Sequence, residues 1–194
     1  MLKEKLKDYK IILASSSPRR QQFFRDLHLD FDVRLKEVDE IFPDDLKHHE
    51  ITDFLALLKS NAFDTNLADN ELLVTSDTIV WHNDRALGKP KDYNDAFEIL
   101  KSLSNATHEV ITSVCFKTNQ KTVLIHEVSK VTFCELSDEV IDYYIKNYKP
   151  FDKAGAYGIQ EWIGFVGVSK IEGSYSNIMG LPVKRVFDYF QQLP

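Results

Sequence analysis

Two strand patterns follow one another in this sequence without a helix between them, and they restrict the sheet that the chain can form. Strand-type residues fill 108–116 and 122–134, and the polar turn Thr118–Lys121 joins them. The rest of the chain alternates strand and helix patterns. A purely doubly wound sheet would keep a helix between successive strands, so we expect an α/β fold with helices around a mixed sheet.

The remaining strands and helices are predicted from apolar periodicity and from capping residues. Strands are expected at 11–15, 30–38, 72–81 and 163–171. Helix starts or apolar helix faces are expected at Pro18, along the stripe from Ile51 to Ala62, at Asp92 or Asn94, at Ser137 and at Pro182. The segment His82–Arg85 is typical of a turn.

Length and charge restrict the possible classes further. The chain has 194 residues, which suits one domain over 1–194 or two lobes that share a core. Its formal net charge is −6, whereas a general nucleic-acid binder is more often basic. Any binding site for an anion must therefore be a local positive pocket on an acidic protein.

The cysteines, histidines and apolar runs bear on metals and on the compartment. Cys115 and Cys134 lie in apolar runs without a Cys-x-x-Cys pair, which favours buried free thiols over a disulfide or a metal site. Apart from the neighbours His48 and His49, the histidines show no metal-ligand spacing, and those two are expected on a solvated helix start. The N-terminal segment is charged and the apolar runs are too short to span a bilayer. We expect a cytoplasmic protein with no membrane partner.

The turn from Ser15 to Arg20 places two arginines in the first turn of a helix. Ser17 is a natural N-cap, and Pro18 suits the first helical position. The helix macrodipole is already positive there, so each cation is disfavoured by roughly 0.3–1 kcal/mol. A phosphate held by hydroxyls, backbone N–H groups, Arg19 and Arg20 would neutralise the end of the helix. The alternative is a solvated surface pair of arginines.

Asp77 interrupts a long apolar strand. A carboxylate in such a place is costly to bury without a partner, and it is favoured where it faces a cleft and meets a metal ion or a water. The alternative is a carboxylate bonded to a neighbouring backbone group or hydroxyl. Thr78 follows it and points to the opposite face of a regular strand.

Two loops offer further contacts for a ligand, although each is also typical of a structural turn. Gly88 gives close access to the backbone, and Lys89 supplies a point charge that suits phosphate. In the segment 152–160, two glycines permit the backbone to approach a flat ligand. Gln160 ends this segment, and its amide can both donate to and accept from a base edge.

Six blocks, in order, resemble the Maf family of nucleotide pyrophosphatases, also called septum-formation inhibitor Maf. They are LASSSPRR at 13–20, SDTIV at 76–80, LGKPKD at 87–92, THEVITSV at 107–114, DKAGAYGIQ at 152–160 and IEGSYSNIMGLP at 171–182. AGAYGIQ and GSYSN look like the branch that acts on dTTP and UTP. The resemblance implies a Maf/ITPase-like mixed α/β fold with a cleft between two lobes. It also implies hydrolysis of a nucleoside triphosphate to the monophosphate and pyrophosphate.

The same resemblance implies roles for individual residues. Asp77 corresponds to the family's catalytic residue, which acts as a proton acceptor. The specificity positions of the family correspond to Arg19, Thr78 and Gln160. Polar positions around the implied cleft correspond to Glu40, Lys59, Lys89 and Lys153. Glu161 stands where the family usually has glycine.

The implied substrate calls for a metal ion. A nucleoside triphosphate carries about four negative charges, so Mg²⁺ or Mn²⁺ should bridge it to carboxylates, which we expect to be Asp77 and Glu40. The phosphates would also meet the turn through Ser15, Ser17 and Arg20. The family suggests a homodimer, and no stable nucleic-acid partner is expected.

Two other functions remain compatible with the sequence. The chain could bind nucleotide or nucleic acid as a regulator of septum formation without turnover, although such a binder has no need of a buried Asp77. It could also be a pyrophosphatase for modified or non-standard nucleotides instead of dTTP and UTP. A panel of nucleoside triphosphates would separate these possibilities.

Overall fold

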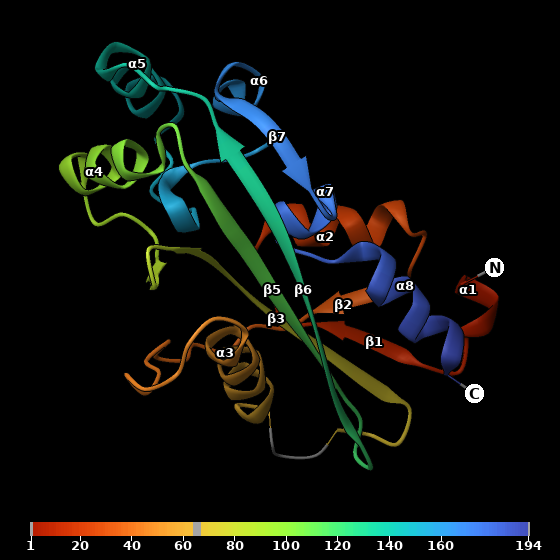
Figure 1. The fold of residues 1–194 in the computed structure, drawn as a ribbon. Helices are drawn as coiled ribbons and strands as arrows, with labels where there is room; N and C mark the ends of the chain where they lie inside the picture. Colours follow the sequence, from red (N-terminus) through yellow and green to blue (C-terminus); the bar gives the residue numbers. More distant parts are fainter. Residues whose placement is uncertain (1, 64–66, 194) are drawn as a thin grey trace. The chain divides into compact units, whose positions relative to one another are not determined.

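A seven-stranded mixed sheet organises the computed structural model, which describes residues 2–63 and 67–193 (Figure 1). The strands are β1 (Lys10–Leu13), β2 (Phe31–Val33), β3 (Glu71–His82), β4 (Arg85–Leu87), β5 (Thr107–Lys117), β6 (Thr122–Phe133) and β7 (Val168–Glu172). Their order is β2-β1-β3-β5-β6-β7, and β4 pairs with β3. Strand β1 is parallel to β2 and β3, whereas β3–β4 and β6–β7 are antiparallel. The predicted mixed α/β fold is therefore confirmed.

Helices connect and cover these strands. They are α1 (Leu2–Lys5), α2 (Pro18–Asp26), α3 (His49–Asn61), α4 (Tyr93–Leu103), α5 (Asp138–Tyr148), the 3₁₀ turn η1 (Ala154–Ala156), α6 (Trp162–Gly167), α7 (Tyr175–Ile178) and α8 (Val183–Gln192). Within the described residues, none of these helices combines the length and hydropathy that a membrane span needs.

The chain divides into two compact units, each with its own apolar core. The first unit contains the residues up to Asp77, Thr112–Glu127, and the residues from Gly180 onward. The second unit contains Thr78–Ile111 and Val128–Met179. Strand β3 passes from the first unit into the second between Asp77 and Thr78, so these neighbouring residues are described with different units.

The core of the first unit lies between the sheet and the helices α2 and α8. Phe24 of α2 and Phe190 of α8 are fully buried, and their rings meet edge to face at 6.2 Å. Alternate residues of β3, Leu72 and Val74, join the same cluster. The predicted apolar face of the last helix is confirmed, since Val186 and Phe190 are fully buried.

The core of the second unit joins α4 and α5 to β5 and β6. Leu100 and Leu103 of α4 and Ile141 of α5 are fully buried in it. Asp92 begins α4 by accepting a hydrogen bond from the backbone N–H of Asp95, at 2.9 Å. Of the two caps that the sequence offers for this helix, the structure uses Asp92.

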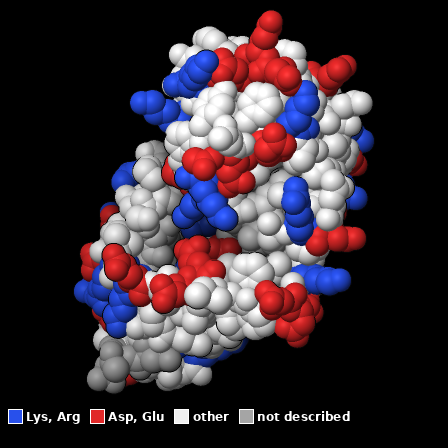
Figure 2. Space-filling model, turned by 90° about the vertical axis from the view of Figure 1, so that its left-hand side faces the viewer, with Lys and Arg blue, Asp and Glu red and all other residues white. Residues whose placement is uncertain are grey.

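The turn and the cysteines follow the sequence prediction in most respects. Asn83 and Asp84 both have positive φ, as a two-residue hairpin turn between β3 and β4 requires. Cys115 and Cys134 are free, and Cys115 is buried, but Cys134 is partly exposed. On the face in Figure 2, acidic and basic side chains are interspersed, in keeping with the mixed charge of the sequence.

The predicted strand over 163–171 is wrong in its first half. Residues Trp162–Gly167 form α6, and the strand β7 begins only at Val168. Helix α6 buries Ile163 and Gly167, which are four residues apart, whereas Phe165 is 76% exposed. The continuous apolar run was therefore interpreted as a strand, although its first half forms a short helix with one buried face.

The predicted strand over 30–38 is also too long. Strand β2 ends at Val33, and the residues that follow it are largely exposed, with Leu35 at 59%. Arg34 turns to Glu71, with its Nη2 atom 2.5 Å from Oε1. Because this segment has no buried face, no alternation of apolar residues holds it in the sheet.

Candidate functional site

The predicted phosphate turn and Asp77 lie at the same end of parallel strands. Leu13, the last residue of β1, is level with Val74 of β3, and Ala14 donates a backbone hydrogen bond to the Val74 carbonyl at 2.9 Å. The turn begins at Ser15, and Asp77 is three residues beyond Val74. Ligands of open α/β sheets bind beyond the carboxyl ends of parallel strands, so both features stand where such a site is expected.

Asp77 forms the centre of a cluster with Lys59 and Glu40, all in the first unit. The Lys59 ammonium lies 2.6 Å from Asp77 Oδ1 and 2.9 Å from Glu40 Oε1. Asp77 is 5% exposed, whereas the Glu40 side chain is about half exposed. Three of the residues that the sequence singled out are thus brought together: two carboxylates share one cation.

Burial raises the pKa of Asp77 above its ordinary value. The positive charges of Lys59 and Arg20 oppose this rise, and the negative charge of Glu40 adds to it. A buried carboxylate with a raised pKa, next to a cation, is typical of groups that accept protons in active sites. This combination makes Asp77 the candidate proton acceptor of the cluster.

Helix α3 positions Lys59 for this contact. The helix runs from His49 to Asn61, as its predicted apolar stripe requires, and Ile51 and Leu55 of that stripe are buried. Lys59 stands in the last turn, where the macrodipole favours a cation. The sequence named Lys59 only by resemblance, and its ion pair with Asp77 comes from the fold.

Arg20 is held by the protein itself. Its Nε donates to the carbonyl of Gly180 at 2.8 Å, and its Nη1 donates to the carbonyl of Ser76 at 3.0 Å. Desolvation lowers the pKa of Arg20, while Asp77 opposes that shift. The alternative of a solvated arginine pair therefore does not hold for Arg20, which ties the start of α2 to β3 and to the segment before α8.

The serines of the turn leave their hydroxyl hydrogens available for a ligand. Ser17 caps α2 as predicted, because its Oγ accepts from the backbone N–H of Arg20 at 3.4 Å. Ser15 Oγ accepts from the backbone N–H of Ser17 at 3.2 Å. A serine hydroxyl that accepts in this way can still donate one hydrogen bond. Arg19 stands beside them in the first turn and is partly buried.

A second cluster of predicted residues lies in the second unit, around Lys153. This lysine is 9% exposed, and its ammonium lies 2.7 Å from Asp152 and 3.1 Å from Glu161. Glu161 also accepts a hydrogen bond from the Tyr144 hydroxyl, which in turn accepts from the Gly158 N–H at 3.0 Å. Glu161 has φ of −95°, so this position does not need the glycine that the family usually has.

The loops of Lys89 and Lys153 are joined within the second unit. The Gly155 N–H donates to the carbonyl of Gly88 at 3.1 Å, directly before the exposed Lys89. Gly155 has φ of +71°, and a Cβ there would lie 2.6 Å from Val80 Cγ2, so a side chain is excluded twice over. Gln160 and Thr78, which the resemblance implies as specificity positions, also belong to this unit and are partly buried.

A third cluster was missed by the sequence analysis. His49, Asp53 and His126 each offer one ligand atom, and these atoms all lie within 4.8 Å of one another. Among the histidines, the sequence shows no metal-ligand spacing beyond the neighbours His48 and His49, so it did not point to this group. The i, i+4 spacing of His49 and Asp53 was the available signal, but His126 joins them from β6, and only the fold reveals that.

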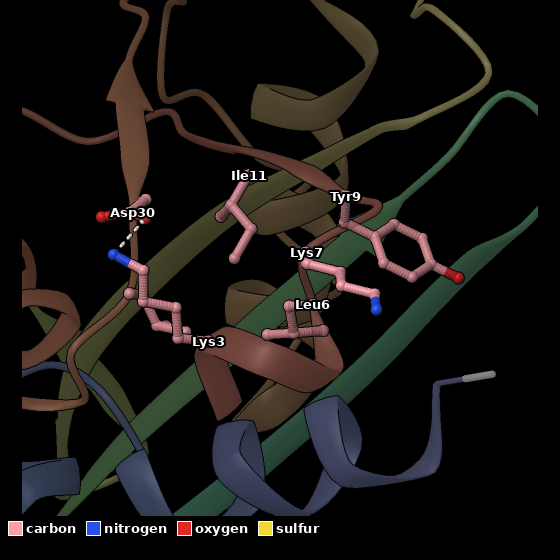
Figure 3. Close-up of a pocket in the computed structure, with 7 residues that line it drawn as sticks. Lys3, Leu6, Lys7, Tyr9, Ile11 and Asp30 are labelled. Carbon is pink, nitrogen blue, oxygen red and sulfur yellow. Dashed lines mark ion pairs between the residues drawn. The ribbon is translucent and has the colours of Figure 1, made fainter. Parts of the chain in front are cut away.

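A pocket of about 120 Å³ lies elsewhere in the first unit (Figure 3). Lys3, Leu6, Ile11 and Asp30 are among its lining residues, and Lys3 pairs with Asp30 at 2.8 Å. It is at the start of β1, whereas the phosphate turn follows the end of that strand. The pocket contains none of the predicted site residues.

Comparison with known proteins agrees with the motifs. A family profile described as Maf-like protein matches residues 10–193. The dTTP/UTP pyrophosphatase of Flavobacterium johnsoniae is 68% identical over 193 residues, which cover 100% of both chains. The protein of the same name from Christiangramia forsetii is 51% identical, over 100% of this chain and 98% of its own. The solved Ham1 protein of Staphylococcus aureus aligns with 66% of this chain and 72% of its own at a TM-score of 0.47 and 15% identity, which is too distant to support an inference.

Proposed function

This chain belongs to the Maf family, and we propose that it hydrolyses dTTP and UTP to the monophosphate and pyrophosphate. The observation that carries this proposal is the buried Asp77 beside Lys59 and Glu40, next to the arginine-bearing start of α2. Full-length relatives of high identity carry the name dTTP/UTP pyrophosphatase, which supports the choice of substrate. The reaction would maintain the nucleotide pool of the cytoplasm.

The triphosphate is expected at the turn that starts α2. Backbone N–H groups at a helix N-terminus and the macrodipole both attract phosphate. The free hydroxyl hydrogens of Ser15 and Ser17 add donors, and Arg19 adds positive charge in the first turn. Arg20 holds the backbone of this site in place through its two carbonyl contacts.

Asp77 would accept the proton of the attacking water. The water oxygen forms a bond to the α-phosphorus, the bond from this phosphorus to the bridging oxygen breaks, and pyrophosphate leaves with that oxygen. A carboxylate whose pKa is raised by burial is a stronger base than an exposed one. The ammonium of Lys59, at 2.6 Å, keeps the carboxylate charged before the reaction begins.

The donor set of this cluster fits a divalent cation. Asp77 and Glu40 offer carboxylate oxygens, the ligands that Mg²⁺ and Mn²⁺ prefer, and both already contact one cation, the Lys59 ammonium. When bound, such an ion would neutralise part of the charge that develops on the phosphates. We propose Asp77 and Glu40 as its ligands.

The base would be selected in the second unit. Uracil and thymine present a carbonyl, an N–H and a second carbonyl, which the amide of Gln160 can meet with one donor and one acceptor. Glu161, the next residue, is fixed by Lys153 and Tyr144, so the backbone beside Gln160 is anchored. We infer that Gln160 and Thr78 set the preference for dTTP and UTP within this unit. Arg19, the third specificity position that the family resemblance implies, belongs to the first unit.

A panel of nucleoside triphosphates with Mg²⁺ tests this function. Pyrophosphate and inorganic phosphate are measured separately for dTTP, UTP, dCTP, CTP, dATP, dGTP and a set of modified nucleotides. The proposal expects pyrophosphate release, with dTTP and UTP as the best standard substrates. Binding of these nucleotides without turnover would instead support a regulator, and faster turnover of modified nucleotides would replace the substrate class.

A further inference from the structure

We propose that His49, Asp53 and His126 form a binding site for a divalent transition metal ion such as Zn²⁺, separate from the Asp77 cluster. His49 and Asp53 stand one turn apart at the start of α3, and His126 reaches them from β6. All three belong to the first unit. Two imidazoles and one carboxylate are a donor set that Zn²⁺, Co²⁺ and Ni²⁺ bind, whereas Mg²⁺ prefers oxygen ligands alone.

The distances within the cluster suit metal ligands after a small adjustment. Asp53 Oδ2 and His126 Nδ1 are 3.5 Å apart. Metal–ligand bonds of about 2.0–2.2 Å place neighbouring tetrahedral ligands about 3.4 Å apart. The His49 and His126 rings lie 4.3 Å apart between centroids with 31° between their planes, so one ring must turn before both nitrogens point at one ion. All ligand atoms are already within 4.8 Å.

Buried hydroxyls hold the carboxylate of Asp53 in a defined orientation. Ser113 is fully buried, and its hydroxyl donates to Asp53 Oδ1 at 2.6 Å. The fully buried Thr52 hydroxyl lies 2.6 Å from that of Ser113. Oδ1 is thereby occupied by the protein, and Oδ2 faces His126. Residues that hydrogen-bond to a metal ligand and orient it in this way are typical of protein metal sites.

A neighbouring ring also contacts His49. Nδ1 of His48 lies 3.4 Å from Nδ1 of His49, which is within hydrogen-bonding distance. A metal-binding histidine commonly uses one ring nitrogen for the ion and the other for a hydrogen bond. Nε2 of His49 is then the nitrogen that would bind the metal. Three protein ligands leave a fourth position for water or another ligand.

This site is distinct from the proposed catalytic cluster, although both use α3. Lys59 is six residues after Asp53, about 9 Å further along the helix axis. Six residues at about 100° each also turn the Lys59 side chain by about 240° around the helix. Loss of the metal site therefore need not affect the chemistry at Asp77.

Calorimetric titration of the full chain with Zn²⁺, in excess Mg²⁺, tests the proposal. The excess Mg²⁺ fills oxygen-only sites, and wild type should still bind one Zn²⁺. His126→Asn and Asp53→Asn should weaken that binding at least about tenfold, since each removes a ligand. His28→Asn is the matched control: His28 is an exposed histidine of the same unit with positive φ, which asparagine tolerates. Its affinity for Zn²⁺ should equal that of wild type.

Two further variants and measurements locate the ion. Asp77→Asn should bind Zn²⁺ as wild type does, and His126→Asn should hydrolyse dTTP at the wild-type rate. Titration with Co²⁺ adds a visible absorption band from the bound ion that should vanish in His126→Asn. Thermal unfolding checks that each variant is folded. Absence of saturable Zn²⁺ binding by wild type, or its loss in Asp77→Asn but not in His126→Asn, would overturn the proposal.

Discussion

Each unit pairs a largely buried lysine side chain with carboxylates, but the two clusters differ in what else holds the carboxylate. In the first unit, Lys59 meets Asp77 on a central strand, and burial raises the pKa of that acid. In the second unit, Lys153 meets Glu161, which also accepts from Tyr144 at the start of a short helix. The pKa of Tyr144 rises because of burial and of Glu161. The first cluster is suited to proton transfer, and the second to holding a loop.

The largest effect should follow removal of the Asp77 charge. Asp77→Asn preserves the shape of the side chain but removes the proton acceptor, so kcat on dTTP should fall by roughly 10²–10⁴-fold. Steady-state kinetics with a circular dichroism spectrum of the purified variant provides the measurement. The control is Asp69→Asn, at an exposed aspartate of the same unit, which should keep wild-type kcat. An Asp77→Asn enzyme with more than about a tenth of wild-type kcat would contradict the assignment.

Replacement of Lys59 should reduce the free energy of unfolding more than replacement of Lys153 does. Lys59→Met leaves Asp77 buried and close to Glu40 without their shared cation, which should cost about 3 kcal/mol of unfolding free energy. Lys153→Met leaves Glu161 with its Tyr144 hydrogen bond, so the cost should be about 1 kcal/mol. Urea unfolding of both variants measures the difference.

Mg²⁺ sharpens this comparison of the two lysines. An ion bound by Asp77 and Glu40 would replace the lost cation, so Mg²⁺ should restore the stability of Lys59→Met and leave that of Lys153→Met unchanged. The same unfolding experiment is repeated with and without the ion. Equal responses of the two variants would argue against a metal site at Asp77 and Glu40.

A change at Gln160 should affect selectivity more than rate. Cytosine would leave a buried group unpaired against Gln160, at a cost of about 1–3 kcal/mol, or roughly 5- to 150-fold in kcat/KM between dTTP and dCTP. Gln160→Ala should reduce that ratio more than it lowers the rate on dTTP. The measurement is kcat/KM on dTTP and on dCTP, for wild type and for Gln160→Ala. A variant with the wild-type ratio would place base recognition elsewhere, with Thr78 next to be tested.

Features that depend on residues close together in the sequence could be predicted from it. Contacts between residues far apart in the sequence could not. The serine cap before Pro18 and the apolar faces of α3 and α8 depend on neighbouring residues, and the structure confirms them. The family was likewise recognised from six short blocks of contiguous residues. Helix α6 was missed because apolar runs do not separate a short helix from a strand.

The contacts of the candidate site also join residues that are far apart in the sequence. Arg20 binds a carbonyl 160 residues away, and His126 meets Asp53 from another element. Nothing in the spacing of these residues along the chain encodes such pairs. Lys59 was named by resemblance alone, and its distance from Asp77 had to come from the structure.

The last expected effect is a pH dependence of stability from Asp77, whose pKa is raised by burial against the opposing charges of Lys59 and Arg20. The folded pKa of Asp77 is raised, so between the unfolded and folded pKa values the folded state binds more protons than the unfolded state. Stability from this group is therefore present at low pH and falls as pH rises through the folded pKa. Asp77→Asn has no carboxyl group that titrates at this position. Wild type should therefore lose stability relative to the variant as pH rises from about 4 toward neutrality. Urea unfolding of both proteins across that range measures the difference, and a wild type that instead gains stability would mean that Lys59 and Arg20 outweigh burial.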